Sequence, residues 1–194
     1  MPAAKTKSDL TYLIKVTLRG IEPPIWRRLR VPGSIRLVRL HEVLQIAMGW
    51  NNGHLHLFEK DGISYCRPAL FDLDEVPPID ESKTSLQNVL REVGEQMVYQ
   101  YDLGDNWEHD VVLEEILVAS ESATKLPICL EGARHSPPED VGGVSGYEGF
   151  LEAIFDPSHE DYQQMLEWAG GRFQPEEFDL QGVNAILAST RRFK

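Results

Sequence analysis

The sequence contains only two cysteines, Cys66 and Cys129, among its 194 residues. Two cysteines cannot build the disulfide framework that stabilises many small exported domains. The chain also shows no long apolar run and no apolar N-terminal segment of the kind found in signal peptides. These absences argue against export and membrane insertion, and they predict a cytoplasmic protein with free thiols.

Local signatures of the common enzyme classes are missing as well. The sequence has no Gly-x-Ser-x-Gly elbow, no glycine-lysine phosphate-binding loop, no dinucleotide fingerprint, no His-Glu-x-x-His pair and no Cys-x-x-Cys. Enzymes that carry these motifs are therefore disfavoured. A site assembled from distant residues would leave no such trace, so catalysis stays open.

Positive charge is scarce: 19 Lys and Arg face 31 Asp and Glu, which gives this acidic protein a net charge of -12. Nucleic-acid affinity comes largely from cations that neutralise phosphates, so this balance opposes it. An early arginine cluster is the exception. It can be interpreted as a local DNA-binding face or, as we prefer, as a solvated strand face followed by the first turn of a helix. Its members are Arg27, Arg28, Arg30, Arg36 and Arg39.

The apolar fraction of 42% is ordinary for a folded globular protein, and alternating or helical periodicity marks its elements. Alternation predicts a strand at residues 10–18, a second at 25–31 and a strand pair at 97–103 and 107–118 joined by a tight turn. A hairpin is expected at 54–67 around Asp61-Gly62. The period changes to that of a helix at residues 37–48, ending at Gly49.

The C-terminal third has a different character. Ser145 with Glu148, and Ser158 with Asp161, have the spacing of helix-capping boxes, and a last helix is expected at residues 180–189. Strands first and helices last favour an α+β fold. We therefore predict a single domain over residues 10–194, with a largely antiparallel or mixed sheet packed by helices and a helical C-terminal third. Residues 1–9 are expected to be a disordered tail, and residues 72–82 a long surface loop.

Two polar segments, punctuated by glycine and proline, concentrate the reactive side chains. The first runs Tyr101-Asp-Leu-Gly-Asp-Asn-Trp-Glu-His109. Alternation along the strand suggests that a carboxylate from the turn, Asp102 or Asp105, orients His109 as a general base. The alternative is that Asp105 and Asn106 cap the turn by bonding to their own backbone.

The second segment runs from Cys129 to Gly143 and contains three glycines and Pro137-Pro138. The prolines hold the chain extended, so Glu139 and Asp140 are presented from a stiff loop. Arg134 would pair with one of them or with an anion. The alternative is a structural loop in which Arg134 and Asp140 satisfy buried backbone.

Two further groups are candidates for specific chemistry. His54 and His56 stand two apart on an expected strand, so both imidazoles would project from one face and could share a divalent metal. The alternative is that the pair hydrogen-bonds beside an aromatic core. Cys129 is expected to be buried among apolar neighbours.

Four blocks of the chain stand in order: Tyr12–Leu18 with Pro24–Arg28, Gly53–Phe58, Tyr101–His109 and Cys129–Tyr147. In these blocks the sequence resembles the plasmid pRiA4b ORF-3-like family, also described as TnpR resolvase-like, over about residues 12 to 187. The resemblance implies a compact α+β domain of unestablished biochemical function, frequently encoded near mobile elements. The resolvase activity is not carried over, because the expected C-terminal helices are acidic rather than basic.

These residues are compatible with three functions. The first is a non-catalytic binding or interaction module, for a small molecule or a protein, with a polar pocket where the two segments converge. The second is a metal-dependent hydrolase in which His54, His56, His109 and a carboxylate hold a divalent metal and Glu139 handles the proton, with His109 and Glu139 the candidate catalytic residues. DNA binding is the least favoured. The pocket would be lined by Asp102, Asp105, Trp107, His109, Arg134, Glu139 and Asp140.

Overall fold

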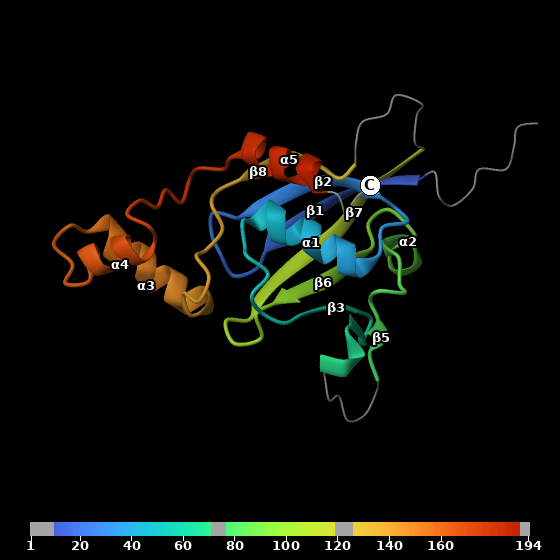
Figure 1. Cartoon of the computed structure of the whole chain (residues 1–194), viewed down its shortest axis with the longest axis horizontal. Coiled ribbons are helices and arrows are strands. Elements are labelled where there is room, and N and C mark those ends of the chain that lie inside the picture. Colours follow the sequence, from blue (N-terminus) through green and yellow to red (C-terminus); the bar gives the residue numbers. More distant parts are fainter. Residues whose placement is uncertain (1–9, 71–76, 119–125, 191–194) are drawn as a thin grey trace, which may run out of the picture.

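An eight-stranded sheet forms the centre of the structure (Figure 1), a computed structural model that describes residues 10–70, 77–118 and 126–190. The strand order is β5-β4-β3-β6-β7-β1-β2-β8, and every pairing is antiparallel except β4 with β5. The predicted α+β class with a mixed sheet is confirmed. The strands are β1 (Leu10–Leu18), β2 (Trp26–Pro32), β3 (His56–Lys60), β4 (Ile63–Cys66), β5 (Ile79–Asp80), β6 (Gln96–Tyr101), β7 (Trp107–Val118) and β8 (Ile128–Ala133).

The clearest alternating sequences form the middle of this sheet. β1 lies between β7 and β2, with Leu10 opposite Val118 and Leu18 opposite His109. The strand predicted at residues 10–18 and the strand pair predicted at residues 97–118 thus lie side by side in one sheet. Inward-facing apolar residues such as Ile14 and Val16 are fully buried, because every second side chain points at the core.

Helices cover this sheet and extend beyond it. In Figure 1, α1 crosses one face of the sheet, α5 lies beside β8, and α3 and α4 project from the left-hand side. Gly49 ends α1 in the left-handed conformation, with φ 83°. The helices are α1 (Leu37–Met48), α2 (Leu86–Val89), α3 (Gly143–Phe155), α4 (Tyr162–Trp168) and α5 (Leu180–Ser189), with a short 3₁₀ helix at Pro68–Leu70.

The helix starts in the C-terminal third differ from the expected ones. Gly142 is the N-cap of α3, three residues before the predicted cap, and Asp161 is the N-cap of α4. Neither makes a side-chain capping bond, so both predicted capping boxes are wrong. β8 was not predicted, and residues 77–82 of the expected loop contain β5. The predicted tail at residues 1–9 lies outside the described residues.

The early arginine cluster is divided between the core and local ion pairs. Arg27 points inward and is buried, with its guanidinium donating to the carbonyls of Trp26, Ala47 and Ala133. Arg28 pairs with Glu114 and Glu131. The interpretation of a solvated strand face therefore fails at Arg27, which is one residue out of register with the exposed face of β2.

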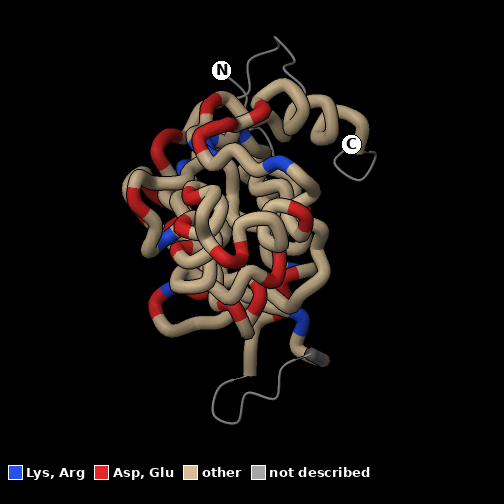
Figure 2. The backbone as a smooth tube through the Cα atoms, turned by 90° about the vertical axis from the view of Figure 1, so that its left-hand side faces the viewer, with Lys and Arg blue, Asp and Glu red and all other residues tan. Residues whose placement is uncertain are grey.

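Acidic residues outnumber basic ones on the face seen in Figure 2. Within the part of the chain that the structure describes, no helix is long and apolar enough to cross a membrane.

Candidate functional site

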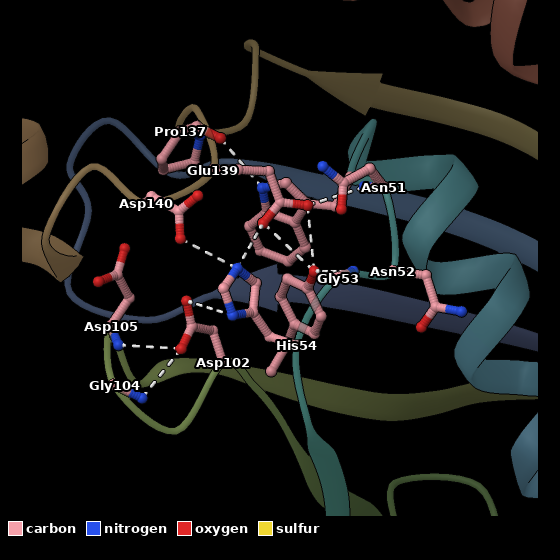
Figure 3. A network of polar contacts seen from close by, with 12 residues as sticks. Asn51, Asn52, Gly53, His54, Asp102, Gly104, Asp105, Pro137, Glu139 and Asp140 are labelled. Atoms are coloured by element: carbon pink, nitrogen blue, oxygen red, sulfur yellow. Dashed lines mark hydrogen bonds and ion pairs between the residues drawn. The ribbon is translucent and has the colours of Figure 1, made fainter.

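Three loops converge on His54 (Figure 3). They are the segment 50–54 that follows α1, the 102–106 turn between β6 and β7, and the 137–142 loop that precedes α3. His54 Nδ1 lies 3.6 Å from Asp102 Oδ2, and His54 Nε2 lies 3.0 Å from Asp140 Oδ1 and 3.8 Å from Glu139 Oε2. Both polar segments identified in the sequence thus contribute carboxylates to one imidazole. We call these four residues the His54 cluster.

Asp102 is held in place by its own turn. Its backbone adopts φ 54°, and its Oδ1 accepts hydrogen bonds from the amides of Gly104 (2.9 Å) and Asp105 (3.3 Å). Asx side chains stabilise tight turns in this way. Because Oδ1 is engaged, Oδ2 is the oxygen that faces His54. The residue is 7% exposed, so this carboxylate is largely removed from water.

Glu139 is held by the loop that carries His54. Its Oε1 accepts hydrogen bonds from the Asn51 amide (2.8 Å) and the Tyr101 hydroxyl (3.0 Å). The Gly53 amide donates to the same hydroxyl over 3.1 Å. Burial, and then the charge of Glu139, raises the pKa of Tyr101, so its hydroxyl stays protonated and donates to the carboxylate.

The 102–106 turn and the 137–142 loop are joined directly. Asp105 Oδ2 accepts the Gly142 amide at 3.0 Å. Gly143 approaches the turn so closely that a Cβ at this position would lie 2.6 Å from the Asp105 carbonyl oxygen. Asp140, with φ 59°, stands between these contacts and His54 and remains largely exposed.

An aromatic floor lies under the cluster. The Trp50 indole donates to the Pro137 carbonyl over 3.0 Å and stacks on Tyr101 with ring centroids 4.9 Å apart. Trp50 also contacts His109 edge to face. Trp107 was expected to line the pocket, but it is buried in the core behind Trp50, and the aromatic surface near His54 is formed by Trp50 and Tyr101.

His109 occupies a different environment from the one expected. Its ring is fully buried, with Nδ1 3.2 Å from the Tyr99 carbonyl oxygen, and burial lowers its pKa to about 4. The expected pairing with Asp102 or Asp105 is not formed, because strand alternation directs the ring inward, beneath Trp50. His109 is a neutral core histidine at physiological pH, and it does not reach the His54 cluster.

The two histidines expected on one strand face are also separated. β3 begins at His56, and Asn52 in the preceding loop has φ 61°, so strand alternation does not extend back to His54. His56 Nε2 lies 2.8 Å from Glu81, and its ring stacks on His41 at 3.4 Å. His54 and His56 line the same small pocket of about 190 Å³, but only His54 contacts Asp102 and Asp140. Among the described residues, His54 is grouped with Asp102 and Asp140 and not with His56 and His109.

Arg134 stabilises the chain elsewhere. Its Nε donates to Glu176 over 2.9 Å, and its Nη1 donates to the Pro23 carbonyl. The side chain is 8% exposed and turns away from the His54 cluster, which agrees with the structural alternative for this residue. The expected pairing of Arg134 with Glu139 or Asp140 is not formed.

The His54 cluster brings three potential metal ligands together. One ligand atom each from His54, Asp102 and Asp140 lies within 4.8 Å of the other two. Across residues 10–70, 77–118 and 126–190, no other His, Cys, Asp and Glu group meets this criterion, and no Lys or Arg forms an ion pair with these carboxylates. Three carboxylates therefore face one imidazole without a compensating cation.

Sequence reasoning missed three contributors to this site: Trp50, Asn51 and Tyr101. A signal existed for Tyr101, which opens the first polar segment. Trp50 and Asn51 follow the helix-ending Gly49, where an abrupt turn presents side chains and amides to a site.

A family model described as plasmid pRiA4b ORF-3-like protein matches residues 11–182. The chain belongs to this family. A relative from Sinorhizobium fredii (strain NBRC 101917 / NGR234), the uncharacterized protein y4hQ, is 45% identical over 161 residues, covering 81% of this chain and 79% of the relative. The crystal structure of the protein of unknown function MM3350 from Methanosarcina mazei Go1 is similar, with a TM-score of 0.77 and 38% identity. It covers 89% of this chain and 96% of that protein.

Proposed function

We propose that this protein is a binding module whose His54 cluster takes a divalent metal ion. The observation that carries the proposal is the convergence of one imidazole and the carboxylates of Asp102 and Asp140, with ligand atoms within 4.8 Å of one another. Like charges at such short range repel, and a divalent cation relieves that repulsion. Imidazole combined with carboxylate suits zinc and manganese better than magnesium or calcium, which prefer all-oxygen sites.

The surroundings support a site that also accepts a second ligand. Three protein ligands leave open coordination positions on the metal. Glu139, fixed by Asn51 and Tyr101, lies next to His54 and would be available as a hydrogen-bond acceptor for such a ligand. Trp50 and Tyr101 provide an apolar surface beneath. An exogenous group on the metal would thus be contacted by the protein as well.

The test is calorimetric titration of tag-free protein with Zn²⁺, Mn²⁺ and Mg²⁺. We expect one site per chain and preference for Zn²⁺ or Mn²⁺, with at least a ten-fold loss of affinity in His54→Ala and Asp140→Asn. His159→Ala is the matched control, because His159 is exposed to a similar degree as His54 but lies outside the cluster. Absence of stoichiometric binding, or equal binding by His54→Ala, would refute the proposal.

Hydrolysis is the second candidate, and one contact favours it. Glu139 Oε2 lies 3.8 Å from His54 Nε2, beside the three ligands but outside them, where a carboxylate can take a proton from a metal-activated water. Metal-loaded protein would be assayed with p-nitrophenyl esters and phosphates. Turnover that is lost in Glu139→Gln while metal affinity is retained identifies a hydrolase. No turnover leaves a non-catalytic module.

A further inference from the structure

A groove of about 670 Å³ lies between α3 and α4, next to the His54 cluster. Its floor is one face of α3, formed by the small residues Gly146, Gly149 and Ala153, which stand at helical spacing. Its wall includes Phe150 from α3 and both Met165 and Trp168 from α4. Trp168 is 48% exposed, which is unusual for so large an aromatic side chain and typical of residues that anchor interfaces. The groove is therefore shaped for an apolar side chain of a partner.

The two glycines of the floor differ in a way that points to an occupant from outside the chain. A Cβ at Gly146 would lie 1.9 Å from the Val141 carbonyl oxygen, so internal packing requires glycine there. A Cβ at Gly149 would have no atom within 4 Å. Glycine inside a helix costs roughly 1 kcal/mol relative to alanine, and the fold of the chain itself gives no reason for it at this position. The glycine keeps open a space that no described residue fills.

The charge around the groove selects the partner. The ionisable residues that line it are Asp140, Glu152, Asp161 and His159, and no Lys or Arg of the described residues is part of the lining. A second copy of this chain would bring further negative charge, since its net charge is -12. An anionic membrane surface is repelled for the same reason. A basic partner is attracted, both on encounter and in the bound state.

We propose that the α3–α4 groove binds a basic peptide segment of another protein, with an aromatic or long aliphatic side chain inserted over Gly149 and flanking Lys or Arg beside Glu152 and Asp161. Methionine and tryptophan walls accept such anchors readily because methionine adapts its shape. The proposal goes beyond the metal site and does not depend on it, although Asp140 borders both.

The experiment is selection of a random twelve-residue peptide library on phage, with metal-free wild-type protein as bait and Gly149→Leu protein as the counter-selection. We expect enriched peptides that combine an aromatic or aliphatic anchor with two or more Lys or Arg. Their synthetic forms should bind wild-type protein at least ten-fold more tightly than Gly149→Leu or Trp168→Ala, as measured by fluorescence anisotropy. Phe155→Ala is the matched control, because Phe155 is an exposed aromatic of α3 that does not line the groove.

Three results would overturn the proposal: no enrichment, enrichment of acidic or neutral peptides, or equal binding to Gly149→Leu. Circular dichroism and urea unfolding of Gly149→Leu and Trp168→Ala check that lost binding does not reflect misfolding. Light scattering measures the oligomeric state. A wild-type dimer that Gly149→Leu abolishes would identify a second copy of the chain as the occupant of the groove, and the proposal of a basic peptide would be wrong. If the metal titration shows no binding, the proposed metal site is refuted, while the peptide-binding measurements still test the groove.

Discussion

Replacing Gly143 with alanine tests whether the contact between the 102–106 turn and the 137–142 loop maintains the site. Gly143 has φ 71°, in the left-handed region, where a Cβ costs about 1–2 kcal/mol. The new Cβ would also lie 2.6 Å from the Asp105 carbonyl oxygen, a backbone atom that cannot rotate away. Forced displacement of packed atoms costs a further 1–3 kcal/mol or so, which gives a loss of roughly 2–5 kcal/mol.

Gly142→Ala is the comparison that separates the two costs. Gly142 has φ 93°, but its Cβ would approach only the Gly146 Cα, at an ordinary 3.6 Å. We therefore expect this variant to lose only the conformational cost of about 1–2 kcal/mol. Urea unfolding followed by circular dichroism measures both variants. If Gly143→Ala unfolds at the same urea concentration as Gly142→Ala, the close approach to Asp105 does not constrain the loop, and our account of the junction is wrong.

Two further predictions concern buried groups. Burial lowers the pKa of His41 to about 3 and that of His109 to about 4, so the unfolded chain binds protons at a higher pH than the folded chain does. The free energy of unfolding should therefore be constant above pH 7 and decrease from about pH 6.5 toward pH 4. In His109→Gln this decrease should be shallower. A pH-independent urea midpoint across this range would contradict it. Burial raises the pKa of the Cys66 and Cys129 thiols to about 11, so both should react with Ellman's reagent at pH 8 far more slowly in native protein than in urea; equally fast reaction in both states would show that the thiols are accessible.

The periodicity of apolar residues predicted those strands whose own sequence alternates clearly. Leu10–Leu18 alternates cleanly, and Trp107–Val118 does too, so their pairing follows from the need of each strand to bury one face. β8 shows only a weak alternation of apolar and polar residues, since Gly132 and Ala133 follow Glu131. It lies at the edge of the sheet, where only one neighbouring strand pairs with it. The N-cap of helix α3 is Gly142, whose backbone adopts a positive φ. The spacing of a capping box does not predict a start of this kind.

The structure brings some of the predicted loop residues together and places the predicted strand residues elsewhere. Asp102, Glu139 and Asp140 lie in turns outside the alternating strands, and all three carboxylates lie near His54. His109 and Trp107 obey strand alternation and enter the core. The role of His54 depends on where β3 begins, which is set by the Asn52 turn and its contacts with Gln45 and His41. Those contacts are tertiary, so local sequence does not reveal them.

β1 is an interior strand of the sheet, and this position has a consequence for how the chain folds. Its neighbours in the sheet are β2, which follows it directly in the sequence, and β7, which begins about ninety residues later. The pairing with β7 places Leu18 opposite His109. During synthesis, one edge of β1 therefore remains unpaired until β7 has left the ribosome. Strand edges exposed in this way promote aggregation. Slow translation between these two strands should thus reduce the yield of folded protein more than a pause after β7.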